Sequence, residues 1–144
     1  MKIQLKNVKH AGFSSEETHC YSASIWVDGK RIGTVENDGH GGPDRFHGDW
    51  DAWKLADNYC RTKGEWHNLE GECCDLVNRW LMARDLKRML KKRILFAKEG
   101  GIFEIGTKPT ALALAQFKAR RAGVVPLNEM EFEAALDLFA KMAQ

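Results

Sequence analysis

The chain has 144 residues, of which 44% are hydrophobic and 29% charged, and 22 Lys and Arg residues against 20 Asp and Glu residues give a net charge of +2. This composition is typical of a globular protein, excludes collagen-like and disordered chains, and is too balanced for a histone-like protein. No apolar run approaches the ~20 residues that cross a bilayer, and the first ten residues lack the apolar core of a signal peptide. We therefore expect a single domain over residues 1–144, located in the cytoplasm and making no membrane contact.

Residues 1–48 are expected to be mainly β. Polar and apolar residues alternate from Tyr21 to Val27, which is the period of a half-buried strand. Asp28-Gly29 predicts a type I′ turn, which would place Ile25 opposite Ile32 in an antiparallel hairpin. The glycine-rich run that begins near Asn37 is expected to end regular structure until the first helix.

Residues 49–99 are expected to be mainly α. Asp49 is a candidate N-cap for a helix that ends near Gly64. A longer helix should begin near Asn68, because apolar residues recur in steps of three and four as far as Ile94. The glycine pair at 100–101 would terminate it.

Residues 100–144 are expected to be mixed. The pattern predicts a strand at 102–105, a helix at 109–121, a brief strand at 124–125 and a final helix capped by Asn128. The fold class is therefore α+β: an N-terminal antiparallel hairpin or sheet, packed with a long central helix and followed by a strand-helix-strand-helix segment.

The glycine-rich segment at 38–49 is a candidate binding loop. Glycines let backbone N–H groups approach a ligand, and the start of a helix favours an anion. The candidate residues for a ligand or partner here are His40, Gly41, Gly42, Arg45 and His47. The spacing matches no established phosphate-binding loop. Two other interpretations stay open: a tight connection with solvated histidines, or a metal-dependent hydrolase or nuclease that uses His40, His47 and Asp49.

A basic stripe follows one side of the long helix. Its members recur at i, i+3, i+4, i+7 and i+8, and they are Arg84, Lys87, Arg88, Lys91 and Lys92. Such a stripe can contact the phosphates of a nucleic acid or a nucleotide, or an acidic protein partner. The alternative is an ordinary solvated helix face. The sequence contains no familiar catalytic motif, so we predict a non-enzymatic protein with no catalytic residue, cofactor or metal.

Several segments resemble a group of short bacteriophage and prophage proteins. The chain shares with them S-E-E-T at 15–18 before a strand, a D-G-K hairpin at 28–30 and a G-H-G-G loop at 39–42. The stretch V-P-L-N-E at 125–129 is similar as well. The resemblance implies a phage origin and a cytoplasmic life in the host cell during infection.

The resemblance also implies a function, because small phage proteins of this kind often counter host defence. We therefore expect a non-catalytic binding protein that acts on an immune protein complex, such as a CRISPR effector, or that traps a signal nucleotide. A nucleic-acid-binding accessory protein is a further alternative, and a homo-oligomer is left open.

Overall fold

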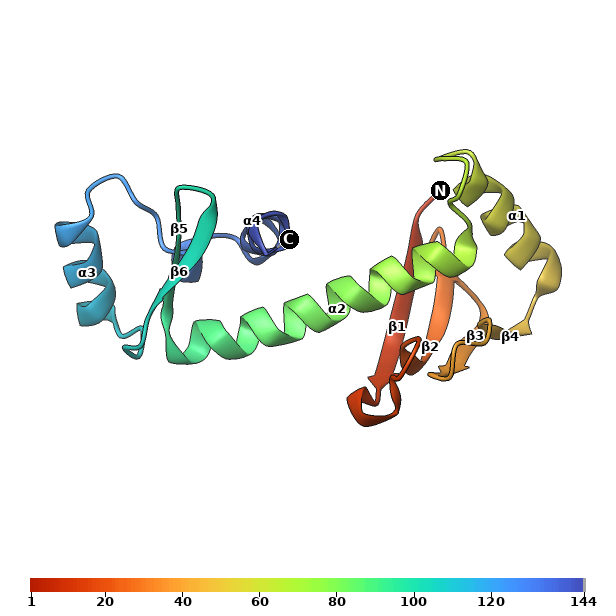
Figure 1. Cartoon of the computed structure of the whole chain (residues 1–144). Coiled ribbons are helices and arrows are strands. Elements are labelled where there is room, and N and C mark those ends of the chain that lie inside the picture. Colours follow the sequence, from red (N-terminus) through yellow and green to blue (C-terminus); the bar gives the residue numbers. More distant parts are fainter. Residues whose placement is uncertain (144) are drawn as a thin grey trace. The chain divides into compact units, whose positions relative to one another are not determined.

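The structure, a computed structural model, describes residues 1–143 and confirms the α+β class (Figure 1). The chain forms two compact units: unit 1 runs from Met1 to Trp80, and unit 2 begins at Leu81. Helix α2 (Leu69–Lys92) contributes its first half to unit 1 and its second half to unit 2. A single domain over the whole chain stays a prediction.

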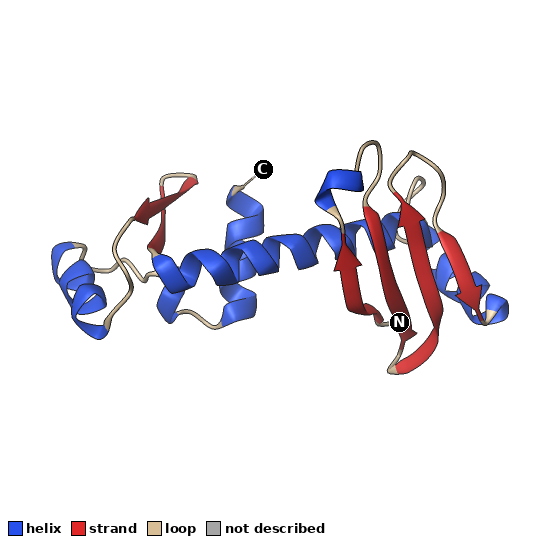
Figure 2. Cartoon of the chain, turned by 90° about the horizontal axis from the view of Figure 1, so that it is seen from below, coloured by secondary structure: helices blue, strands red, loops and turns tan. Residues whose placement is uncertain are grey.

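Unit 1 contains a four-stranded antiparallel sheet in the order β1-β2-β3-β4 (Figure 2). The elements are β1 (Ile3–His10), the short 3₁₀ helix η1 (Gly12–Ser14), β2 (Cys20–Val27), β3 (Lys30–Asp38), β4 (Arg45–Gly48), α1 (Trp50–Arg61) and the start of α2. Consecutive strands are neighbours, so short connections suffice throughout the sheet.

The hairpin between β2 and β3 forms at the predicted turn, but its register differs by one residue. Asp28 and Gly29 have φ values of 48° and 81°, and Val27 pairs with Lys30. A β-bulge then shifts the pairing, so Ile25 faces Gly33. The prediction that Ile25 faces Ile32 is wrong, because the bulge leaves one extra residue in β3.

Strand β4 lies inside the segment that was expected to be a loop. Arg45 pairs with Glu36 and His47 with Thr34, so both are strand residues. Phe46 between them is 5% exposed, whereas its two neighbours are exposed. The prediction of an irregular connection up to the first helix is therefore wrong for 45–48, where edge pairing with β3 satisfies the backbone.

Two helices cover one face of the unit 1 sheet. Asp49 caps α1 as predicted, since its carboxylate accepts the N–H groups of Asp51 and Ala52. The ring centroids of Trp53 on α1 and Phe46 on β4 lie 4.6 Å apart. The fully buried side chains of the helices are spaced at helical intervals, and they are Ala56, Cys60, Leu69, Cys73 and Val77.

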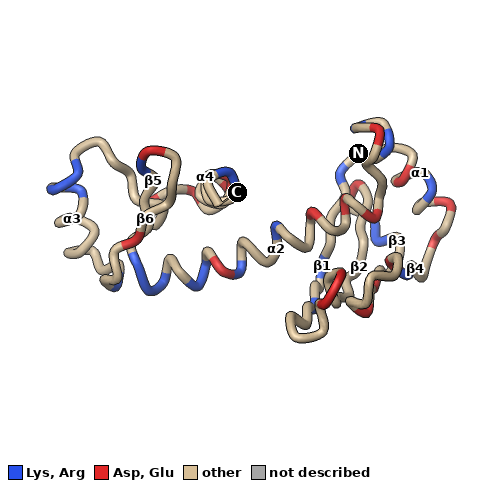
Figure 3. The backbone as a smooth tube through the Cα atoms, in the orientation of Figure 1, with Lys and Arg blue, Asp and Glu red and all other residues tan. Residues whose placement is uncertain are grey.

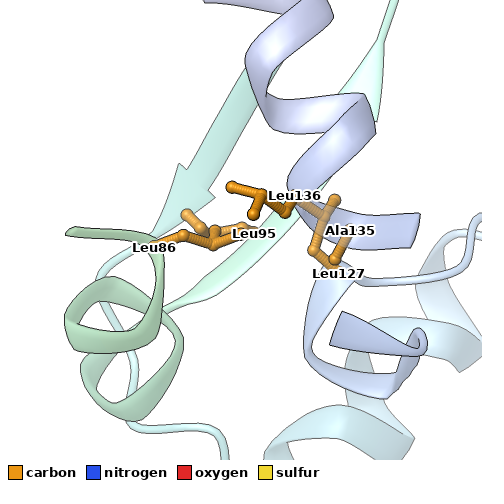
Figure 4. Packing of buried hydrophobic residues seen from close by; sticks show 5 residues of the cluster. All are labelled: Leu86, Leu95, Leu127, Ala135 and Leu136. Carbon is orange, nitrogen blue, oxygen red and sulfur yellow. The ribbon is translucent and has the colours of Figure 1, made fainter. Parts of the chain in front are cut away.

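Unit 2 combines the second half of α2 with a strand pair and further helices. The elements are β5 (Ile94–Lys98), β6 (Gly101–Ile105), α3 (Ala111–Arg120), the 3₁₀ helix η2 (Leu127–Glu129) and α4 (Phe132–Met142). One buried cluster joins α2, β5, η2 and α4 through Leu86, Leu95, Leu127, Ala135 and Leu136 (Figure 4).

Three sequence predictions for unit 2 are wrong. Helix α2 ends at Lys92 and not near Gly100, because the apolar run that begins at Ile94 forms strand β5 and pairs with β6. No strand forms at 124–125. Asn128 does not cap the final helix, since the carboxylate of Glu131 accepts the first free N–H groups of α4. A run of consecutive apolar residues does not by itself distinguish a buried strand from a helix.

Candidate functional site

Two loops that are distant in sequence lie against each other in unit 1. The carbonyl oxygen of Gly39 accepts hydrogen bonds from the backbone N–H groups of Glu16, Glu17 and Thr18, at 3.1, 3.0 and 3.4 Å. The 15–19 loop is thereby fastened to the 38–44 loop. The S-E-E-T and G-H-G-G segments therefore form one structure.

Asn37, which is 6% exposed, holds this structure together with its side-chain amide. Its Oδ1 accepts from the hydroxyl of Thr18 at 2.7 Å and from the N–H of Gly39 at 2.9 Å. Its Nδ2 donates to the carbonyl of Gly42 at 2.9 Å and to Asp44 Oδ1 at 3.0 Å. A buried amide with both ends satisfied fixes the shape of the loop.

The two loops, the neighbouring ends of β2 and β3, and the first turns of α2 line an open cavity of about 430 Å³. We call it the acidic cavity, because its lining includes four carboxylates and no Lys or Arg. Its lining residues are Ser15, Glu16, Glu17, Thr18, His19, Tyr21, Asn37, Asp44, Glu70, Gly71 and Cys74. The volume falls within the range of small-ligand pockets.

Asp44 is one of two half-buried acids of this cavity, and Glu70 is the other. Its Oδ2 accepts the Tyr21 hydroxyl at 2.7 Å, and its backbone N–H donates to Glu70 Oε1 at 2.9 Å. Burial raises the pKa of Asp44, and the charge of Glu70 raises it further, against the hydrogen bonds from Tyr21 and Asn37. The cavity thus holds a carboxyl group whose ionisation is disfavoured in the absence of a positive charge.

The raised pKa of Asp44 predicts a pH-dependent stability. An Asp in the unfolded chain releases its proton near pH ~3.9, whereas Asp44 in the folded state keeps its proton to a higher pH. Protonated Asp44 therefore contributes to the free energy of unfolding at low pH, and this contribution is lost as pH rises through the folded pKa. We expect urea unfolding between pH 4 and 7 to show the wild type losing stability relative to Asp44→Asn. Asp75→Asn, on the exposed side of α2, is the control for the lost charge. The raised pKa of Asp44 would be contradicted if the free energy of unfolding of the wild type, minus that of Asp44→Asn, stayed constant or grew with pH.

The predicted loop residues divide between two places. His40, Gly41 and Gly42 lie in the 38–44 loop, where His40 Nδ1 is 3.3 Å from Glu16 Oε2. Arg45 and His47 are on β4, and both approach Glu36 Oε1, at 3.7 and 3.5 Å. None of these five residues lines the acidic cavity. An anion or partner site made of these five residues stays a prediction, and its three charged or titratable members, His40, Arg45 and His47, approach carboxylates.

The metal interpretation of the same segment finds little support. His40 contacts Glu16, His47 contacts Glu36, and Asp49 is engaged as the cap of α1. Within residues 1–143, the group of side chains that could hold a metal ion lies elsewhere, at the junction of α1 and α2.

The basic stripe lies on the second half of α2, in unit 2 (Figure 3). Arg84 is 3.5 Å from Asp85, and the Lys87 ammonium lies 5.1 Å from the centre of the Phe132 ring. The other three members, Arg88, Lys91 and Lys92, are exposed. Their role in binding a phosphate or a partner stays a prediction.

Charge is distributed unequally between the two units. Unit 1 holds 10 of the 22 basic and 13 of the 20 acidic residues, a net charge of −3, whereas unit 2 holds 12 and 7, a net charge of +5. The overall charge of +2 conceals this asymmetry. The acidic cavity and the basic stripe therefore suit ligands of opposite charge.

Sequence reasoning missed the carboxylates of the cavity. Glu16, Glu17, Asp44 and Glu70 come from three separate segments, and no spacing rule connects them. The available signal was the S-E-E-T segment, which the resemblance singled out without giving it a role.

Comparisons of the chain with protein-family models, with curated proteins and with solved structures gave no match. Among the helices of residues 1–143, none combines the length and the apolar character that a membrane span requires.

Proposed function

We propose that this protein is a non-catalytic binding protein whose acidic cavity accepts a basic side chain of a protein partner. The observation that carries the proposal is the cavity lining, which includes the carboxylates of Glu16, Glu17, Asp44 and Glu70 and no Lys or Arg. A cationic group would relieve the repulsion between Asp44 and Glu70 and would donate charge-assisted hydrogen bonds to the ionised carboxylates.

The size and the lining of the cavity favour an arginine or lysine side chain over a bare ion. At about 430 Å³ the cavity has room for an aliphatic stem as well as a charged head. Tyr21 and Cys74 supply less polar surface beside the carboxylates. A guanidinium presents several N–H donors in one plane, which suits neighbouring carboxylates.

The same charges oppose the nucleotide alternative at this site. A phosphate in the cavity would face four carboxylates, and Arg45, a predicted phosphate ligand on β4, lies outside the cavity lining and approaches Glu36 on β3. Of the two ligands suggested by the resemblance, we therefore favour a protein. The assignment of that partner to bacterial defence, for example to a CRISPR effector, rests on the resemblance to short phage proteins.

The proposal predicts selective binding of a model guanidinium ligand. We expect N-acetyl-arginine amide to shift the NMR amide signals of Gly39 and Gly71, and AMP to leave them unchanged. Asp44→Asn and Glu70→Gln should each weaken the arginine affinity about tenfold, since each removes a charge that faces the ligand. Affinity should also rise with pH as Asp44 ionises.

Asp75→Asn removes the same formal charge from α2 but lies outside the cavity lining, so its affinity should equal that of the wild type. Shifts of these amides with AMP and none with the arginine compound would contradict the proposal. So would an unchanged arginine affinity in both cavity variants.

A further inference from the structure

A second group of ligand-type side chains lies where α1 ends and α2 begins. Cys60 is in the last turn of α1, His67 is in the connection, and Glu72 is in the first turn of α2. Cys60 Sγ, one ring nitrogen of His67 and one carboxylate oxygen of Glu72 all lie within 4.8 Å of one another. None of the three lines the acidic cavity, so this group is independent of the proposed function.

Contacts of the surrounding backbone help to assemble this group, in addition to those among the three side chains. Asp57 Oδ1 accepts the backbone N–H of Leu69 at 2.9 Å, which joins α1 to the start of α2. Leu69 is fully buried, and the N–H of His67 donates to the carbonyl of Gly64 at 3.2 Å. The fold therefore brings the three side chains together in advance of any ligand.

The separations of these ligand atoms lie within about 1 Å of those that a tetrahedral metal requires. Ligand atoms at about 2.0–2.3 Å from zinc stand roughly 3.3–3.8 Å from each other. His67 Nε2 and Glu72 Oε2 are 2.6 Å apart, which is the length of a strong hydrogen bond. A metal bound to both atoms would increase this distance by about 1 Å. Their side chains are 26% and 18% exposed, which leaves the pair open to an entering ion.

The donor set points to a particular class of ion. A thiolate, an imidazole and a carboxylate together suit Zn²⁺, whereas Mg²⁺ and Ca²⁺ prefer oxygen ligands alone. Cys60 is fully buried, and burial raises the pKa of its thiol. A metal would displace that proton, as happens when thiols coordinate zinc.

Lys63 contacts Glu72, one of the three proposed ligands, from the solvent side. Its ammonium lies 3.3 Å from each carboxylate oxygen of Glu72, and its side chain is 39% exposed. A metal at Glu72 must displace this ammonium, and a flexible surface lysine can leave when the metal enters.

We propose that Cys60, His67 and Glu72 bind a zinc ion, with the fourth position taken by water. Binding releases the Cys60 thiol proton to solvent, and the neutral His67 ring carries its proton on Nδ1 while Nε2 coordinates the metal. The ion would fasten the end of α1 to the start of α2 and stabilise the connection that carries Trp66, which is 90% exposed.

The experiment titrates the full chain with Co²⁺, as an optical probe of thiolate ligation, and then with Zn²⁺. We expect one ion per chain, a thiolate-to-cobalt charge-transfer band, and a higher melting temperature with zinc. Cys60→Ser should abolish the band, and Glu72→Gln should keep it while weakening affinity by about tenfold or more. Cys20→Ser is the matched control and should behave as the wild type, because Cys20 lies outside this group and outside the lining of the acidic cavity.

Lys63→Met gives a test that does not depend on removing a ligand. Without the competing ammonium at Glu72, zinc should bind severalfold more tightly than to the wild type. The proposal would be overturned if zinc bound at well below one ion per chain. It would equally be overturned if the cobalt band survived in Cys60→Ser, or if Lys63→Met weakened binding.

Discussion

Gly39→Ala should lower the free energy of unfolding of unit 1 by about 3 kcal/mol and open the acidic cavity. Gly39 has φ +87°, a conformation that side chains rarely adopt, and an added Cβ would stand 2.0 Å from the carbonyl oxygen of Ser14. Relief of this contact must move the 15–19 loop. The carbonyl of Gly39 would then lose its three N–H donors, and Glu16 and Glu17 would leave the cavity wall.

Urea unfolding measures the stability loss, and amide hydrogen exchange at residues 16–18 reports the loop. Gly42→Ala is the matched control, because nothing lies within 4 Å of a Cβ at that position. It should change stability by no more than about 0.5 kcal/mol. If Gly39→Ala matched Gly42→Ala in both measurements, the role given to Gly39 in joining the two loops would be incorrect.

Asn128→Ala should lower the free energy of unfolding of unit 2 by about 2–4 kcal/mol. The Asn128 amide accepts the N–H of Leu95 at 3.0 Å and donates to the carbonyls of Leu90 and Arg93, at 3.0 and 2.8 Å. It thus satisfies the backbone at the end of α2 and at the start of β5. Alanine would leave these groups without a partner beside a fully buried Leu95.

Hydrogen exchange distinguishes this role from the N-cap role that the sequence suggested. The Leu95 amide should exchange faster in Asn128→Ala, whereas the amides of Glu133 and Ala134, which donate to Glu131, should keep their protection. Gln116→Ala, at an exposed position on α3, should leave both unchanged. Faster exchange confined to the start of α4 would restore the N-cap interpretation.

Local signals in the sequence were sufficient to predict elements that depend on interactions between residues close together in sequence. The Asp28-Gly29 turn, the Asp49 cap and the helical period of α1 and of most of α2 all depend on residues within a few positions of each other. Capping and turn preferences act at that range, which is why the α+β class and these boundaries were predictable.

Predictions failed where distant segments decide the outcome. The helical periodicity of apolar residues predicted that α2 continues beyond Lys92, because the residues of β5 are also apolar. They form a strand because they pair with β6. β4 was missed for the same reason, since its four residues have no strand pattern apart from their pairing with β3. Strand formation depends on a partner strand, which a local window does not contain.

For function, the sequence by itself determined which residue types were available and that the glycine-rich segment is unusual. Only the tertiary structure brought Asp44 and Glu70 to the S-E-E-T loop, and His67 and Glu72 to Cys60. The physical reason is that charge and ligand geometry depend on distance in space. Hydrogen bonds of Gly39 and Asn37 hold the acidic cavity together, and the hydrogen bond from the Leu69 N–H to Asp57 holds the Cys60, His67 and Glu72 group together. Each of these bonds joins segments that are distant in sequence.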